Sequence, residues 1–321
     1  MKTKNRQRLL WLFLAVGIVS ACKKETDNIF TMFRDVHVTF NGNHPLSVTD
    51  YKLVNDGDSV YVDYTIMSDN KDMYTVVVEK VGGAQGNGPE RTNNVVSEES
   101  ERRSYSRVIK LKMQRDGKTS YRIYALDRFG TYIGDGYKKV TIEVNPSYMV
   151  YADRRIYSPD SVEKVLPSFF SLRRAEAFSY QNGQANAADI DFGIWRKVTT
   201  VNGNPVYTYN YYSLTASPNP FPIYDISSWQ KRDTKFSAPV KGGTNTFLYN
   251  LVSASTIEAQ AKTRSLNVKS TDYSTPADGL AAGNLVYFLT PEGKYGVLHV
   301  NQVTDDLQKR PYLNVSIKIQ N

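Results

Sequence analysis

The chain has 321 residues, with 40 Lys+Arg against 32 Asp+Glu, a hydrophobic content of 40% and a single Cys. The length predicts about two domains, and the hydrophobic content excludes a globally disordered protein. One Cys excludes an intrachain disulfide framework and zinc sites built on several Cys, while three His leave few ways to build a metal or nucleophile–base site.

The first 21 residues have the pattern of a secretory leader. Four basic residues between positions 2 and 8 precede the apolar residues 9–19 (LLWLFLAVGIV). A helix of this length spans about 16 Å, which is too short for a bilayer core of about 30 Å. The pattern therefore predicts a signal peptide at residues 1–21 rather than a transmembrane helix.

The leader ends in a motif with a specific implication. Val19-Ser20-Ala21-Cys22 resembles the lipobox of bacterial lipoproteins, which is cleaved before the Cys. The resemblance implies lipid attachment at Cys22, through a thioether-linked lipid and an acylated, palmitate-type N-terminus. Several acyl chains anchor a protein stably, whereas one chain gives marginal binding. The alternative is a plain secretory signal in which this Cys occurs by chance.

Residues 22–32 are predicted to form a flexible tether, because the stretch KKETDN after Cys22 is polar. It resembles the Lys-plus-acidic export signal of Bacteroidetes surface lipoproteins, although Thr26 separates the two acids. The resemblance implies an outer-membrane, lipid-anchored protein exposed on the cell surface, with a periplasm-facing anchor as the alternative. The membrane is thus one expected partner, through the lipid anchor.

The charge of the mature chain is ordinary. The leader holds four of the basic residues, so 36 Lys+Arg remain against 32 Asp+Glu and the net charge falls from +8 to +4. This balance gives no argument for a nucleic-acid partner.

Residues 33–145 show short apolar alternations with period two, separated by turn signals such as Asn41-Gly42-Asn43. Six or seven such strands over roughly 110 residues predict a β-sandwich. The stretch 121–130 (YRIYALDRFG), followed by a last strand, resembles the end of bacterial immunoglobulin-like and fibronectin-like modules, in which the Asp and Gly shape a turn. The resemblance implies an immunoglobulin-like β-sandwich and carries no function of its own.

Residues 146–321 begin at Pro146 and are again mostly strand-like, with a short helix expected within residues 250–265. We therefore predict an all-β chain whose larger C-terminal β-rich domain does any binding. The stretches 189–192 (DIDF) and 284–300 (NLVYFLTPEGKYGVLHV) resemble the C-terminal domain of uncharacterised Bacteroidetes lipoproteins. More distantly, they resemble the all-β HmuY-type haem-binding lipoproteins.

The resemblance to HmuY-type lipoproteins implies haem capture as one function of the chain. Haem held by two axial ligands needs His or Met side chains, and the second domain offers Met149 and His299. A lone His in a strand is more often a packed residue than a ligand. We therefore expect no cofactor and keep a Met149–His299 pair as an alternative.

Groups suited to catalysis are few. Asp189 and Asp191 lie two apart on an expected strand, so their carboxylates share a face, as paired carboxylates do in glycoside hydrolases. A solvated strand face explains the same pair more simply. The chain has no G-x-S-x-G, H-E-x-x-H or P-loop motif. We therefore expect no catalytic residue, no metal site and no enzymatic activity.

Aromatic residues are the remaining candidates for a binding site, since the chain has 23 Tyr and 3 Trp. Tyr207, Tyr209 and Tyr211 share one face of an expected strand, and Trp195 and Trp229 are further candidates. Exposed rings bind sugars and also anchor protein contacts, although the same rings can instead fill a core. The leading hypothesis is a non-catalytic ligand-capture module for glycans. The alternatives are a structural or adhesive protein that binds another surface protein, and haem capture.

Overall fold

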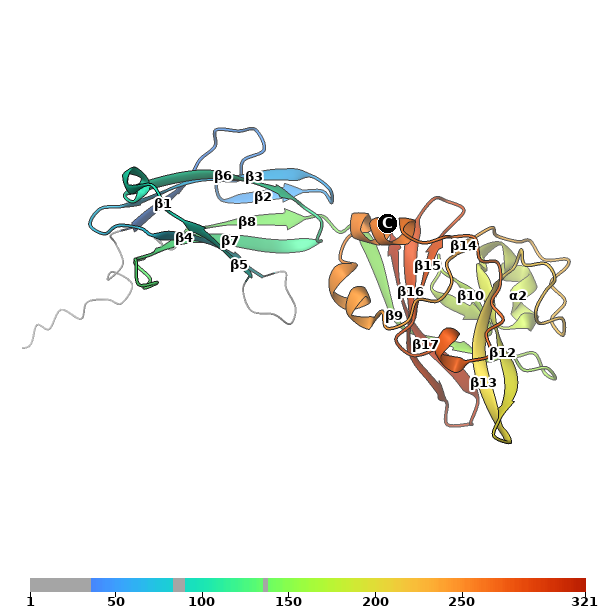
Figure 1. Cartoon of the computed structure of the whole chain (residues 1–321). Helices are drawn as coiled ribbons and strands as arrows, with labels where there is room; N and C mark the ends of the chain where they lie inside the picture. Colours follow the sequence, from blue (N-terminus) through green and yellow to red (C-terminus); the bar gives the residue numbers. More distant parts are fainter. Residues whose placement is uncertain (1–35, 83–89, 135–137) are drawn as a thin grey trace, which may run out of the picture.

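The computed structural model describes residues 36–82, 90–134 and 138–321 of the chain. Within these residues it is built from strands with only short helices, so the predicted all-β class is confirmed. Figure 1 shows two domains one after the other, joined between β8 (Lys139–Val144) and β9 (Tyr148–Tyr157). The signal peptide, the lipidated Cys22 and the tether lie outside the described residues and stay predictions.

The first domain is a sandwich of two sheets. Its elements before β8 are β1 (Val36–Phe40), β2 (Tyr51–Val54), β3 (Ser59–Ser68), β4 (Thr75–Val81), β5 (Glu90–Val95), the 3₁₀ turn η2 (Glu99–Glu101), β6 (Ser104–Lys112) and β7 (Gly117–Leu126). One sheet has the order β1-β3-β6 and the other the order β2-β8-β7-β4-β5. Strand β2 pairs with β8 in parallel, whereas the other ladders are antiparallel.

The alternating apolar residues of these strands meet between the two sheets. Val60 and Val62 of β3 and Val140 and Ile142 of β8 are fully buried and belong to one cluster. Successive side chains of a strand point to opposite faces, so a period of two places every second residue in the core. The strand order supports the immunoglobulin-like interpretation of residues 33–145, which stays a prediction.

The turn after β7 is built as its sequence predicts. The carboxylate of Asp127 accepts hydrogen bonds from the backbone N–H groups of Phe129 and Thr131, both at 2.8 Å. Gly130 has a φ of 77°, a region that glycine adopts without steric penalty. The Asp closes the turn and the Gly allows the chain to reverse.

The second domain continues after β9 with two sheets and short helices. Its elements are β10 (Phe169–Ser171), β11 (Glu176–Phe178), α2 (Tyr180–Asn186), η3 (Ala187–Asp189), β12 (Phe192–Val201), β13 (Asn204–Ser213), β14 (Lys235–Phe236), the π-helical η4 (Thr246–Asn250), α3 (Ala254–Lys262), η5 (Pro276–Asp278), β15 (Leu285–Leu289), β16 (Tyr295–Asp305) and β17 (Pro311–Gln320). The helix expected within residues 250–265 is present as α3. Helix α2 was not expected, because its sequence YQNGQAN has no apolar stripe.

The two sheets of this domain pack face to face. One has the order β14-β15-β16-β17-β9 and the other the order β11-β10-β12-β13. Phe192 and Tyr211 of the smaller sheet share a buried cluster with Val300 and Leu313 of the larger one. Helix α3 and η4 cover the outer face of the larger sheet, while α2 and the loops around Trp229 cover that of the smaller sheet.

Two aspartates of the first domain hold the start of α3 in the second. Asp56, in the turn after β2, accepts hydrogen bonds from the backbone N–H (2.6 Å) and the hydroxyl (2.8 Å) of Ser255. Asp116, in the turn before β7, accepts from the N–H and hydroxyl of Ser147, whose hydroxyl oxygen in turn accepts from the N–H of Ala254. Carboxylates stabilise a helix N-terminus because its first N–H groups lack partners. These contacts hold the two domains against each other.

We expect Asp56→Ala to loosen this junction. The loss of a capping carboxylate costs about 1 kcal/mol of stability and removes both bonds to Ser255. Small-angle X-ray scattering of the variant is expected to show a broader distribution of interdomain distances, and the linker around Pro146 is expected to be cut faster by protease. Asp50→Ala is the matched control, because Asp50 is an exposed aspartate of the same domain. Equal scattering from both variants would contradict the role given to Asp56.

Candidate functional site

The predicted tyrosines share a face but do not form an exposed platform. Strand pairing places Tyr207, Tyr209 and Tyr211 on one side of β13. That side faces the core, so Tyr209 and Tyr211 are only 5% and 2% exposed, and the hydroxyl of Tyr211 donates to the backbone carbonyl of Ser237 at 2.6 Å. Tyr207, nearer the hairpin turn, is 44% exposed. The three rings therefore cannot meet one ligand together.

The two predicted tryptophans belong to the core under α2. The ring of Trp229 is buried and packs against Phe169, with ring centroids 4.7 Å apart. It also fills the space beside Gly183, where a Cβ would lie 2.1 Å from the ring. Trp195 is half-buried against the same cluster. The buried ring of Trp229 is therefore not presented to a ligand.

The paired aspartates do not share a strand. Asp189 ends η3 and forms ion pairs with Arg173 and Arg174. Asp191 lies in the segment before β12 and is fully buried, so the interpretation of a solvated strand face is wrong for it. The two carboxylates therefore have different hydrogen-bond and ion-pair partners.

Asp191 is the centre of a buried polar network. It accepts hydrogen bonds from the backbone N–H of Leu172 at 2.7 Å, from Nε of Arg232 at 2.9 Å and from the hydroxyl of Thr234. The other edge of the Arg232 guanidinium donates to both carboxylate oxygens of Glu292, at 2.9 and 2.8 Å. Burial raises the pKa of Asp191, against the effect of Thr234 and Arg232, whereas the bonds from Arg232 lower the pKa of Glu292 to about 2. The network joins the two sheets beside their shared core.

We expect Arg232→Leu to destabilise the fold by about 3–5 kcal/mol at pH 7, because it leaves the Asp191 carboxylate buried without its cation. The penalty should shrink as the pH falls, since burial raises the folded-state pKa of Asp191 and a protonated carboxyl group needs no cation. Urea unfolding at pH 7 and pH 5 measures both effects. Arg173→Leu, which breaks a more exposed ion pair, is the control and should cost at most about 1 kcal/mol. Similar losses in both variants would refute the role of the network.

Met149 and His299 cannot ligate one haem iron in this fold. Met149 pairs with Ile319 and His299 pairs with Ser316. Ile319 and Ser316 lie three apart on β17, so their side chains point to opposite faces, and directly paired residues share a face. The two candidate ligands therefore lie on opposite sides of the sheet.

His299 is also already engaged. Its ring stacks on Phe247 with centroids 5.0 Å apart, Nε2 lies 3.0 Å from the hydroxyl of Thr244, and Nδ1 lies 2.7 Å from the amide oxygen of Asn301. Burial lowers the pKa of His299, which favours the neutral ring. Asn301 lies at a β-bulge of β16 and donates to Asn314 and Ser316. We infer that the hydrogen bonds of Asn301 with His299, Asn314 and Ser316 hold the bulge in its conformation.

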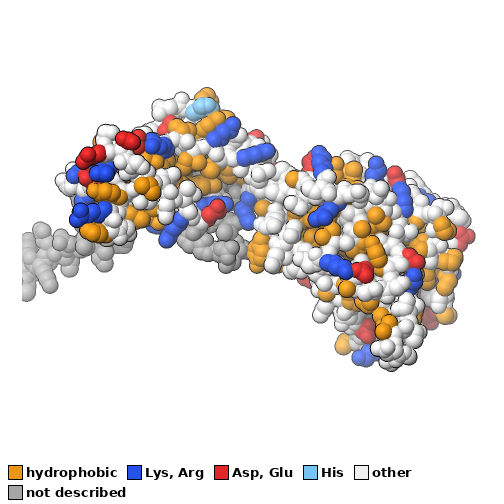
Figure 2. Space-filling view, in the orientation of Figure 1, with side chains coloured by type: hydrophobic (Ala, Val, Ile, Leu, Met, Phe, Trp, Pro, Cys, Tyr) orange, Lys and Arg blue, Asp and Glu red, His pale blue; other side chains and the backbone are white. Residues whose placement is uncertain are grey.

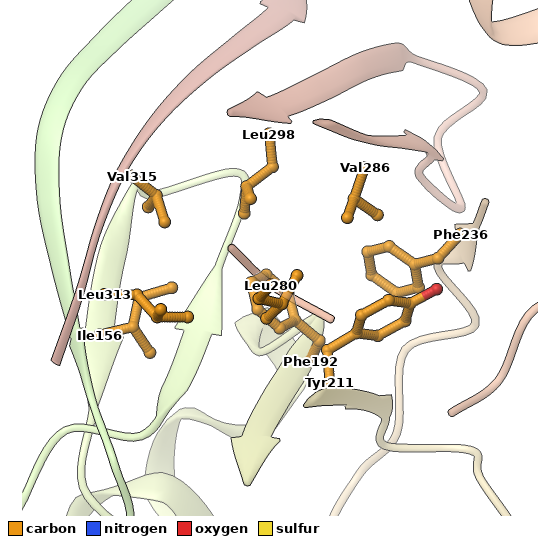
Figure 3. Close-up of a pocket in the computed structure, with 9 residues that line it drawn as sticks. All are labelled: Ile156, Phe192, Tyr211, Phe236, Leu280, Val286, Leu298, Leu313 and Val315. Carbon is orange, nitrogen blue, oxygen red and sulfur yellow. The ribbon is translucent and has the colours of Figure 1, made fainter. Parts of the chain in front are cut away.

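An apolar cavity between the two sheets is too small for a ligand. Its volume is about 10 Å³, and Figure 3 shows its lining side chains converging from both sheets. Such a space holds at most about one water molecule. The hydroxyl of Tyr211, the one polar side-chain group in the lining, is already bonded to Ser237. The cavity is a packing gap in the core.

Two hollows at the surface are large enough for a ligand and meet at Arg310. One, of about 560 Å³, is lined by Arg155, Tyr157, Tyr312 and the turn 305–310 between β16 and β17. The other, of about 510 Å³, is lined by the loop 159–166. We call the first the hairpin hollow. Both volumes lie in the range of small-molecule sites, about 300–1,000 Å³.

The hairpin hollow is built on one pair of strands. Tyr157 of β9 lies directly opposite Tyr312 of β17, with ring centroids 5.4 Å apart. The guanidinium of Arg155 lies 4.9 Å from the Tyr312 ring, and that of Arg310 lies 5.4 Å from the Tyr157 ring. Within residues 146–321 the sequence holds the same short pattern twice, Arg155-Ile-Tyr157 and Arg310-Pro-Tyr312. Sequence reasoning missed this site because only the strand pairing brings the two patterns together.

Comparison with known proteins assigns the chain to no family. No family model matches the sequence, and no curated protein matches it significantly. Among the described residues, no helix has the length and apolar character needed to cross a membrane. The same part of the chain contains no group of three or more His, Cys, Asp or Glu residues that could hold a metal ion. On the visible face, Figure 2 shows basic and acidic side chains interspersed over both domains.

Proposed function

We propose that the chain is a membrane-anchored, non-catalytic surface lipoprotein whose second domain captures a ligand, with glycans as the ligand class. The anchor is the lipidated Cys22 in the outer membrane, and the first domain spaces the binding domain from it. The observation that supports capture is the hairpin hollow, where two tyrosines and two arginines line a space of about 560 Å³.

The composition of the hairpin hollow suits a sugar. Tyr157 is half-buried and Arg155 is exposed, so both can reach a ligand. Tyrosine combines a large apolar ring face with a polar tip, and a sugar combines an apolar C–H face with hydroxyl groups. The guanidinium groups and the carboxylate of Asp305 supply hydrogen-bond donors and acceptors around the rings.

We expect Tyr157→Ala to weaken glycan binding by about tenfold or more, since truncating an aromatic anchor at a binding site commonly costs over 1 kcal/mol. The measurement is a glycan array followed by titration of the bound sugars. Tyr249→Ala is the control, because Tyr249 is 42% exposed on η4 and does not line the hollow. Thermal unfolding checks that each variant is folded. Full binding by the Tyr157 variant would contradict the placement of the site.

A second function, binding of another surface protein, is favoured by two exposed aliphatic side chains. Leu307 in the hairpin hollow is 97% exposed, and Val162 in the neighbouring hollow is 87% exposed. Absence of every glycan signal, with cross-linking to a protein that Leu307→Asp abolishes, would support this function instead.

We expect Cys22→Ser to release the protein from the membrane, because serine lacks the thiol that carries the thioether lipid. In detergent phase separation the wild-type protein should enter the detergent phase and the variant the aqueous phase. Only the wild type should incorporate a labelled palmitate analogue, and protease treatment of intact cells should degrade it if it is displayed outward. An unmodified Cys22 in the mature wild-type protein would refute the anchor.

A further inference from the structure

The two Arg-x-Tyr patterns form a pair of equivalent units in the hairpin hollow. Residues two apart on a strand share a face, so Arg155 and Tyr157 lie on the same side of β9. Tyr157 and Tyr312 are direct partners across the antiparallel ladder. Each arginine therefore reaches diagonally to the tyrosine of the other strand, as the stacking of Arg155 on Tyr312 and of Arg310 on Tyr157 shows.

One of these units already holds a carboxylate. Arg310 donates to Asp306 from Nε at 2.7 Å and forms an ion pair with it through Nη2 at 2.6 Å. The hydroxyl of Tyr157 donates to the same carboxylate at 3.3 Å. The guanidinium carbon of Arg310 lies over the Tyr157 ring, while the N–H groups of the same guanidinium bind the carboxylate. The chain thus shows which ligand group such a unit accepts.

The other unit holds no carboxylate from the described part of the chain. Arg155 is exposed, stacks on Tyr312 and forms no ion pair there, although its pKa is raised, chiefly by a hydrogen bond with Tyr157. Lys309, in the same lining, also forms no ion pair with a described residue. The lining also contains one carboxylate that forms no ion pair with a described residue, that of Asp305. The lining therefore has two cations without an ion pair and one such carboxylate.

The acidic residues of the neighbouring hollow do not cancel this preference. Asp160 is turned toward its own loop, where its carboxylate accepts from the backbone N–H groups of Val165 and Leu166 at 3.1 and 3.0 Å. Glu163 lines the other hollow and not the hairpin hollow. The groups of the hairpin hollow without an ion pair to a described residue are therefore two cations, Arg155 and Lys309, against one carboxylate, Asp305.

We propose that the Arg155–Tyr312 unit binds a carboxylate of the captured ligand, so that the ligand class is an acidic glycan containing uronic acids. This inference rests on the proposed function and names the charge that its site selects. The guanidinium of Arg155 forms two parallel hydrogen bonds to the carboxylate, and the half-buried ring of Tyr157 packs against the sugar. When the bound sugar is neutral, the N–H groups of Arg155 form hydrogen bonds with water instead of with a carboxylate.

The test uses the full-length protein extracted from membranes in mild detergent. The probes are polygalacturonate and the same polymer with its carboxyl groups reduced to alcohols, titrated at low and at physiological salt. The wild type should bind polygalacturonate at least about tenfold more tightly than the reduced polymer, because a charge-assisted bidentate contact exceeds a neutral one by about that factor. The difference in affinity between the two polymers should become smaller as salt is added, because salt screens the charge of the carboxylates.

The matched variants are Arg155→Gln and Arg154→Gln. Arg154 is the exposed neighbour on the opposite face of β9, with a similar charge and no part in the hollow. Arg155→Gln should lose the preference for the acidic polymer, whereas Arg154→Gln should keep it. Equal losses in the two variants, or an unchanged preference in Arg155→Gln, would overturn the inference.

The remaining outcomes separate this inference from the proposed function. Tight binding of the reduced polymer, unaffected by Arg155→Gln, would leave glycan capture standing and refute the acidic ligand. Failure to bind any glycan, together with binding of an acidic protein segment, would refute both.

Discussion

Burial of the facing sheets of the second domain decides which side chains are left for function. Every strand that crosses this domain gives one face to the shared core, and burial of an aromatic or aliphatic side chain there contributes about 1.5–3 kcal/mol. Tyr209, Tyr211 and Phe192 are fixed inside for this reason. Binding groups remain exposed on the strand faces turned away from this core and in the hairpin turns, as Arg155 of β9 and the turn between β16 and β17 are.

The polar network around Asp191 works within the same constraint. An ion pair in a core repays the loss of water only when its buried groups are also hydrogen-bonded, and here the Asp191 carboxylate accepts three hydrogen bonds while Arg232 donates three. The arginine connects the segment before β12 with the turn between β15 and β16. The network therefore sets the relative position of the two sheets, while the apolar cluster supplies most of the free energy.

The hairpin hollow lies at the far end of β9 from the domain junction. Strand β9 begins at Tyr148, beside the contacts of Asp116 with Ser147, and ends at Tyr157 in the hollow. Ten residues of strand span about 30 Å. If the chain is tethered through Cys22, the first domain and this strand together carry the hollow away from the anchor, which suits capture of a ligand outside the cell.

The sequence by itself determined the features that depend on local pattern. Alternation along residues 33–145 predicted the strands of the first domain, the resemblance of residues 121–130 to immunoglobulin-like modules implied the Asp127–Gly130 turn, and a short helix was expected within residues 250–265, where α3 lies. The leader and Cys22 are predictions of the same kind, since cleavage and lipidation depend on a contiguous motif.

Only the tertiary structure decided which residues of those strands could act. Period-two alternation shows that Tyr207, Tyr209 and Tyr211 share a face, but it does not show whether that face meets water or another sheet. The burial of Asp191 and the separation of Met149 from His299 were hidden for the same reason. The two Arg-x-Tyr patterns are about 150 residues apart in the chain, and they form one site only because β9 pairs with β17. Strand pairing joins segments whose separation along the chain carries no signal, so the site had to be found in the fold.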